Sequence, residues 1–233
     1  MTLTALFVAN SDDADTGYVG EQLVRRGYAP RTVLRDQGGL PVDLGDVDAV
    51  VLLGSDWSVH SPVDTVALSA EAELVRTAQT TGVPVLGLCY GAQVVAHALG
   101  GSVFLAAVPE VGFVEVLTDD SSLVPGGPWA QFHLDVIEPP PDARVLAQNA
   151  CGVQAFVLPG VLAVQFHPEV RPDTLDDWSR RFPQMLVAAG LDRATLVAEA
   201  REREPAARSA AYALVDAFLD RVGPQDNGPT SSP

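Results

Sequence analysis

Residues 85–93 read VLGLCYGAQ, and this stretch decides the predicted fold. An apolar run of strand length leads directly to Cys89, and a pattern typical of a helix follows from Tyr90. Gly87 and Gly91 lie two positions before and after the cysteine, which is the spacing of the nucleophile elbow G-x-S-x-G with cysteine in place of serine. A buried strand that turns abruptly into a helix indicates an α/β protein.

Strands and helices alternate on the N-terminal side of this stretch. Apolar runs of strand length, each bounded by Gly, Pro or Asp, occur at 4–10, 31–36 and 49–55. Residues 61–82 have helical spacing, begin with Ser-Pro and end at a glycine. Strands that alternate with helices predict a parallel sheet covered by helices on both faces.

The pattern changes after residue 101. Short runs joined by turns alternate apolar with polar residues, as antiparallel strands do, at 113–118, 132–139, 143–149 and 153–166. Two helical patterns, at 174–190 and 194–223, come next, and Pro205 is expected to break or kink the second. The sequence therefore predicts a mixed, mostly parallel central sheet flanked by helices.

The chain is predicted to form one domain. It covers residues 1–222, and its C-terminal helices lie within 173–222. The remaining residues, 223–233, lack apolar side chains and are predicted to be disordered.

The composition limits the partners and the compartment. The 233 residues include 30 Asp and Glu against 14 Lys and Arg, a net charge of −16 that repels phosphate backbones and anionic lipids. We therefore expect neither nucleic acid nor a membrane as a partner. No signal-peptide pattern and no run of about 18 apolar residues is present. Two cysteines, 62 positions apart, make neither a disulfide framework nor a metal-ligand cluster, which indicates the cytoplasm.

Cys89 is a candidate nucleophile. The following helix directs its N-terminus at the sulfur, and the positive end of the helix dipole favours the thiolate. The free N–H groups of the first helical turn, that of Tyr90 first among them, can stabilise an oxyanion. The alternative is that Cys89 is a small buried apolar residue, as most free cysteines are. A second residue must decide between the two.

His167 and Glu169 supply that second signal. Residues 164–169 read VQFHPE, so the pair follows an apolar strand, and in an extended segment both side chains point the same way. A carboxylate beside an imidazole fixes its tautomer and stabilises the imidazolium formed when a thiol proton is taken. The alternative is a surface turn with a solvated acid. Because Cys89 and His167 each follow a predicted strand, both are expected at the carboxyl edge of the sheet.

Together, PVLGLCYGAQVVAHALGG and VQFHPEV resemble the class I, or triad-type, glutamine amidotransferases, over about residues 45–171. The resemblance implies a flavodoxin-like fold in which Cys89 is the nucleophile, His167 the base and Glu169 the orienting acid. It also implies hydrolysis of the side-chain amide of glutamine through a thioester, which yields glutamate and ammonia without a cofactor or a metal.

Three further segments match this family. Residues 53–59, LGSDWSV, look like the family's G-G-P-x-S-V loop, which implies Gly54 at the substrate and the main chain of Ser55 as the second oxyanion donor. Gln93, one helical turn after the cysteine, matches the family's substrate-binding glutamine. The segment FHLD resembles the family's S-H-x-D strand end, whose backbone lies along the α-amino and α-carboxylate groups of glutamine; its matching residues are His133, Leu134 and Asp135.

The destination of the ammonia divides the functional hypotheses. No P-loop and no G-x-G-x-x-G motif after a strand is present, so the expected acceptor is a separate synthase or ligase. One alternative is a hydrolase of other γ-glutamyl amides that uses the same triad. Another is a binding module that keeps this fold without catalysis.

Other polar residues receive structural interpretations. His97 is expected to be packed or at the surface, and Cys151 to lie in a turn or at a strand start. His60 follows the oxyanion loop; the preferred interpretation is a loop residue, and the alternative is a residue that lines the site. The acidic run 11–15, SDDAD, is interpreted as an N-cap with acids in the first helical turn.

Overall fold

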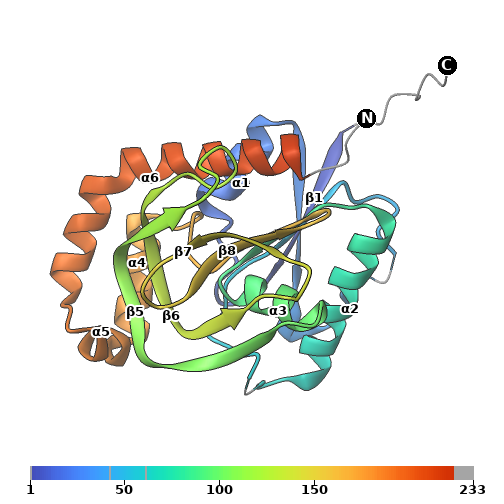
Figure 1. Ribbon diagram of the computed structural model, residues 1–233. Coiled ribbons are helices and arrows are strands. Elements are labelled where there is room, and N and C mark those ends of the chain that lie inside the picture. Colours follow the sequence, from blue (N-terminus) through green and yellow to red (C-terminus); the bar gives the residue numbers. More distant parts are fainter. Residues whose placement is uncertain (1, 42, 61, 223–233) are drawn as a thin grey trace.

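The computed structural model describes residues 2–41, 43–60 and 62–222, and the predicted tail at 223–233 lies outside them. A nine-stranded mixed sheet has helices on both of its faces (Figure 1). Its order is β2-β1-β3-β4-β9-β8-β6-β5-β7. The strands are β1 (Leu3–Ala9), β2 (Tyr28–Leu34), β3 (Ala49–Leu52), β4 (Val85–Leu88), β5 (Ser102–Thr118), β6 (Gly127–Glu138), β7 (Arg144–Gln148), β8 (Val153–Leu158) and β9 (Val161–Val164). The helices are α1 (Gly17–Arg25), η1 (Arg35–Gln37, a 3₁₀ turn), α2 (Thr65–Thr81), α3 (Tyr90–Ala98), α4 (Pro172–Arg181), α5 (Pro183–Ala189) and α6 (Arg193–Arg221).

The N-terminal half confirms the predicted alternation of strands and helices. Strands β2, β1, β3 and β4 are parallel neighbours, and β9, from the second half of the chain, extends this parallel set beside β4. All four residues of β3, and all four of β4, are buried, which explains why these strands read as continuous apolar runs. The carboxyl ends of these strands form one edge of the sheet.

The prediction of a mostly parallel sheet is not confirmed. Four strand pairs are parallel and five are antiparallel. Strands β5, β6, β8 and β7 pair with one another in a closed cycle, and β5 is much longer than the predicted run at 113–118. The shift in register between Leu105 and Glu110 interrupts the alternation of apolar and polar residues in β5. For this reason the sequence pattern did not indicate the first half of the strand.

Alternate residues of the parallel strands feed two separate cores. Phe7 and Leu88 face α1 and α6, where they join Phe218. On the opposite face Leu6 and Val50 join apolar residues of α2 and α3. Figure 1 shows the same layers, with α6 beside α1 on one side of the sheet and α2 beside α3 on the other. Helices packed on both faces therefore hold the carboxyl edge of the parallel strands in place.

Two predictions about helices are corrected, and for the break or kink predicted at Pro205 only the break is excluded. The acidic run 11–15 is a loop, because α1 begins at Gly17 after Thr16 and has no acid in its first turn. The pattern at 174–190 comprises two helices, since Pro183 has no N–H to continue α4 and instead begins α5. Pro205 lies inside the single helix α6 and does not break it, but α6 changes direction along its length (Figure 1), in line with the predicted alternative of a kink.

Helix α2 ends at the predicted glycine, but it begins after Asp64 rather than at the Ser-Pro pair that the sequence predicts. Its N-cap is Asp64, whose carboxylate accepts hydrogen bonds from the N–H groups of Val66 and Ala67. Gly82 ends the helix in the left-handed conformation. None of the helices in the described part of the chain is long and apolar enough to cross a membrane.

Candidate active site

Cys89 sits in a strained turn between β4 and α3. Its φ of 48° and ψ of −107° make it the one non-glycine residue with positive φ in the described part of the chain. The helix approaches the strands so closely that a Cβ atom on Gly91 would lie 2.1 Å from the carbonyl oxygen of Leu52, and one on Gly87 would lie 2.8 Å from that of Gly91. The two glycines therefore permit the elbow that the sequence predicts.

His167 and Glu169 form a buried pair beside this elbow. Nδ1 of His167 lies 2.8 Å from Oε1 of Glu169, and the His167 N–H donates to the carbonyl of Ala130 at 2.9 Å. Nε2 of His167 is buried and has no hydrogen-bond partner among the described residues. With Nδ1–H donated to the carboxylate, Nε2 is left to exchange a proton with another group.

The Cys89 sulfur is that neighbouring group. A Cβ atom built on Gly54 would lie 2.9 Å from Cε1 of His167 and 3.7 Å from Cβ of Cys89, so the three residues converge on one point. Although burial opposes a charged imidazole, the charges of the Cys89 sulfur and the Glu169 carboxylate raise the pKa of His167 well above 6.5. The amide of Gln165 also faces the sulfur, with Nε2 3.6 Å from Sγ.

The raised pKa of His167 can be measured by NMR titration of its imidazole. In the wild-type protein we expect a midpoint above 6.5, so His167 stays protonated at neutral pH and loses its proton only as the pH rises further. In Cys89→Ala the midpoint should fall, because the charge that most favours the imidazolium is gone while burial still opposes it. An unchanged midpoint in that variant would contradict contact between sulfur and imidazole.

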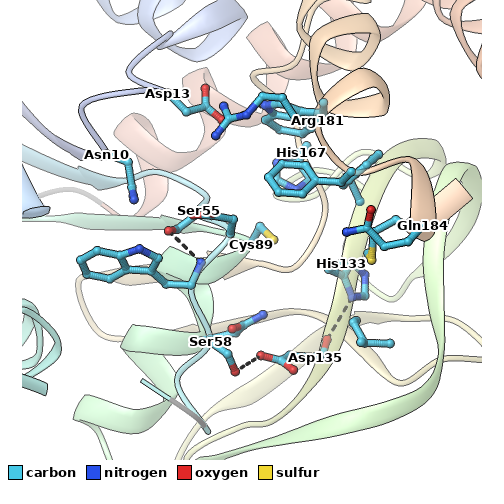
Figure 2. A pocket seen from close by; sticks show the side chains of 18 of the residues that line it. Asn10, Asp13, Ser55, Ser58, Cys89, His133, Asp135, His167, Arg181 and Gln184 are labelled. Carbon is cyan, nitrogen blue, oxygen red and sulfur yellow. Dashed lines mark hydrogen bonds between the residues drawn. The ribbon is translucent and has the colours of Figure 1, made fainter. Parts of the chain in front are cut away.

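A cavity of about 370 Å³ opens over Cys89 and His167, a size typical of small-molecule sites. Figure 2 shows Cys89 and Ser55 at its middle, Asp13 and Arg181 toward one end, and Ser58 and Asp135 toward the other. The wall combines residues from the loops after β1 and β3 with residues from β6, α4 and α5. Within the described residues, no group of three or more His, Cys, Asp or Glu side chains is arranged to hold a metal ion.

Comparison with known proteins agrees with this geometry. The family described as "Glutamine amidotransferase class-I" matches residues 22–180. This chain belongs to the class I glutamine amidotransferases. One subunit of a glutamine-hydrolyzing GMP synthase from Sulfurisphaera tokodaii is 36% identical over 141 residues, which are 56% of this chain and 72% of the relative. A glutamine-hydrolyzing GMP synthase from Aeropyrum pernix is 42% identical over 142 residues, 55% of this chain but 26% of the relative.

Solved structures share the fold over nearly the whole chain. A glutamine amidotransferase from Thermotoga maritima has a TM-score of 0.84 at 21% identity, covering 94% of this chain and 99% of its own. One from Methylobacillus flagellatus has a TM-score of 0.82 at 19% identity, covering 97% of each. At these identities the likeness concerns the fold. It extends beyond residue 180, so α4, α5 and α6 belong to a shared architecture.

Most residues predicted to bind substrate line the cavity of this amidotransferase. They are Ser55, Gln93, His133, Leu134 and Asp135. Gly54 lies behind the cavity wall, where a side chain would strike His167. The side chain of Tyr90 is buried and packs against Arg35, 4.9 Å from the guanidinium to the ring centroid, so it does not line the cavity.

The His133 and Asp135 side chains belong to hydrogen-bond networks. Both ring nitrogens of His133 face oxygens, the carbonyl of Asp135 at 2.9 Å and the Glu110 carboxylate at 3.0 Å. The Asp135 carboxylate accepts from Ser58 Oγ at 2.6 Å and lies 3.4 Å from His60 Nδ1. These contacts hold the end of the cavity formed by β6. His60 therefore lines the site, which was the less favoured of its two interpretations from the sequence.

The opposite end of the cavity was not predicted. Trp178 packs edge-on against His167, with ring centroids 4.8 Å apart, and its Nε1–H donates to Asp13 at 2.7 Å. Burial and the nearby Glu169 carboxylate raise the pKa of Asp13. Arg181 of α4 pairs with Asp12 and so joins the helix to the loop after β1. The sequence of the acidic run 11–15 was interpreted as a helix start. No local pattern indicated these contacts, because their partners lie more than 150 positions away in the chain.

Two other histidine and cysteine interpretations are confirmed. His97 is exposed in the last turn of α3. Cys151 lies in the turn before β8 and is partly buried. Neither residue lines the cavity.

Proposed function

We propose that this chain hydrolyses the side-chain amide of L-glutamine, with Cys89 as nucleophile, His167 as acid and base, and Glu169 as the group that orients His167. The observation that carries the proposal is a strained cysteine beside a buried imidazole–carboxylate pair at the floor of a cavity. The family's description names the same substrate.

The proposed reaction has two steps. The Cys89 sulfur adds to the amide carbon, and the carbonyl electron pair moves to the oxygen. As that pair returns and the C–N bond breaks, His167 gives its proton to the departing nitrogen. The nitrogen leaves as ammonia, and the glutamyl group stays on Cys89 as a thioester. His167 then takes a proton from water, whose oxygen adds to the thioester carbon. As the carbonyl forms again the C–S bond breaks, so that glutamate is released and the Cys89 thiolate and the His167 imidazolium are restored.

The oxyanion formed in each step needs donors that are in place beforehand. We assign this role to the main-chain N–H groups of Ser55 and Tyr90, one from the loop after β3 and the other from the first turn of α3. Gln93 and residues 133–135 line the same cavity and are assigned to the rest of the glutamine molecule. Gly54 contributes by letting the loop approach His167.

The ammonia is proposed to pass to a separate synthase or ligase chain. The Sulfurisphaera relative is named as one subunit of a GMP synthase, whereas the Aeropyrum GMP synthase is a longer chain of which the matched part is 26%. A glutaminase domain thus occurs among these relatives both as part of a larger protein and as a chain of its own. We infer the separate arrangement for this protein, and a cytoplasmic location for the complex.

A second candidate substrate class is favoured by the shape of the site. The cavity continues past Cys89 to the apolar side chains of Phe132, Phe182 and Met185. This space is larger than a departing ammonia molecule requires. A γ-glutamyl amide with an organic amine would place that amine there.

One assay tests the function and separates these substrates. Purified protein is incubated with L-glutamine, and glutamate and ammonia are measured; we expect equal amounts of both. The same assay with γ-glutamyl-ethylamide and γ-glutamyl-anilide compares kcat/KM for the three amides. Faster turnover of either substituted amide would move the assignment to the second class, and no glutamate from any of them would contradict both.

A further inference from the structure

Arg35 is a charged side chain that is almost completely buried near the site, and it plays no part in the reaction described above. It follows β2 in the 3₁₀ turn η1, and 1% of its surface is exposed. A guanidinium has five N–H donors, and in this protein each has one acceptor. The acceptors are Oε1 of Glu71, Oδ1 of Asn10 and the carbonyl oxygens of Val8, Leu53 and Gly54.

These acceptors place Arg35 directly beneath the candidate oxyanion loop. The Val8 and Leu53 carbonyls, at 3.2 and 2.9 Å, lie at the carboxyl edge of the sheet, where β1 and β3 end. The Gly54 carbonyl, at 3.0 Å from Nη1, belongs to the peptide unit whose N–H is that of Ser55. Because the peptide is planar and trans, its C=O and N–H point in opposite directions. Holding the carbonyl toward the buried guanidinium therefore turns the Ser55 N–H away from it, toward the cavity side.

The charge of Arg35 adds to this geometric effect. A cation that bonds to a peptide oxygen polarises the peptide and makes its N–H a stronger donor. The Tyr90 ring lies 4.9 Å from the same guanidinium, so Arg35 also contacts the residue that carries the second proposed oxyanion donor. The compensating carboxylate, Glu71, comes from α2 and bonds to Nε, on a different part of the guanidinium from the nitrogen that binds Gly54.

We propose that Arg35 is a positioning residue that sets the Ser55 peptide, and through it the oxyanion hole, in its active orientation. This inference rests on the proposed hydrolysis of glutamine. Arg35 itself touches no substrate, since it is buried behind the loop and does not line the cavity.

The first test is Arg35→Lys, which keeps the charge but offers three donors for five acceptors. We expect kcat for glutamate release to fall about 10²-fold, as when one oxyanion donor is lost, with KM for glutamine little changed. Affinity for glutamate γ-semialdehyde should fall by a similar factor, because its addition to Cys89 forms an S–C bond and moves the carbonyl electron pair to the oxygen. Alkylation of Cys89 by iodoacetamide, which forms no oxyanion, should keep its wild-type rate.

A second variant covers the case in which Arg35→Lys does not fold. Arg35→Met combined with Glu71→Leu removes both buried charges, so neither is left without its partner, and such replacements often preserve a fold. Both variants are assayed below their melting temperatures, with circular dichroism to verify folding. A folded variant of either kind with wild-type kcat would overturn the inference.

The pattern of results separates this inference from its alternatives. A purely structural role for Arg35 would lower semialdehyde affinity and iodoacetamide reactivity together, and would also contradict the proposal. Wild-type protein that releases no glutamate would instead contradict the proposed function. Wild-type turnover with an unaffected Arg35→Lys variant would contradict the positioning role alone.

Discussion

Cys89→Ala is expected to lower kcat for glutamate release by at least about 10⁴-fold, to the level of the uncatalysed reaction or close to it. Without the sulfur no thioester can form, and the His167–Glu169 pair has no nucleophile to activate. Alanine retains the Cβ atom, so the strained turn at φ 48° changes little. We expect a melting temperature within about 4 °C of wild type, since the loss is one small buried group.

The chain supplies its own matched control for this variant. Cys151→Ala makes the same chemical change in a turn that does not line the cavity, and it should retain wild-type kcat. Iodoacetamide should label Cys89 in preference to Cys151, and mass spectrometry of the digested protein will show which was modified. Full turnover by Cys89→Ala would contradict the role of Cys89 as nucleophile, whereas labelling of Cys89 no faster than Cys151 would favour the binding-module hypothesis.

The parallel half of the fold and the elbow were predictable because they depend on local sequence. Residues buried on both faces of a parallel strand must be apolar, and a helix that touches strand backbone needs glycine at the contact, as Gly91 does over Leu52. The approach of His167 to Cys89 needed one more rule, that parallel strands end at a common edge. β4 and β9 obey it as direct neighbours.

The antiparallel half and the outer wall of the site depend on partners that no local pattern specifies. The bulge in β5 breaks its alternation, and α4 and α5 place Trp178 and Arg181 against a loop at the other end of the chain. Arg35 was missed for a related reason. Arg35 falls near the end of the predicted strand 31–36, where an arginine normally indicates a solvated face, and only the tertiary fold supplies the five acceptors that make its burial stable.

Glu169→Gln is the second variant for which we expect a large effect, a loss of about 10³- to 10⁴-fold in kcat with KM for glutamine little altered. The amide can turn its NH₂ group toward Nδ1 of His167, which then accepts a hydrogen bond and leaves the proton on Nε2, the nitrogen that must take it from Cys89. The substitution also removes a negative charge that raises the pKa of His167. The imidazole titration should therefore move to lower pH, and the imidazolium should be lost at a pH where the wild-type protein still holds it.

The effect of the His167 tautomer on activity can be separated from the effect of the lost charge by measuring kcat and the His167 titration on the same protein. If charge alone mattered, lowering the pH would restore the imidazolium in Glu169→Gln and recover most of the activity. If the tautomer matters, kcat stays low at every pH, because protonation supplies the acid but the neutral form still presents the wrong nitrogen as base. Glu115→Gln, on an exposed position of β5, makes the same change outside the site and should leave both measurements unaltered. Wild-type kcat in Glu169→Gln would exclude an orienting role for this carboxylate.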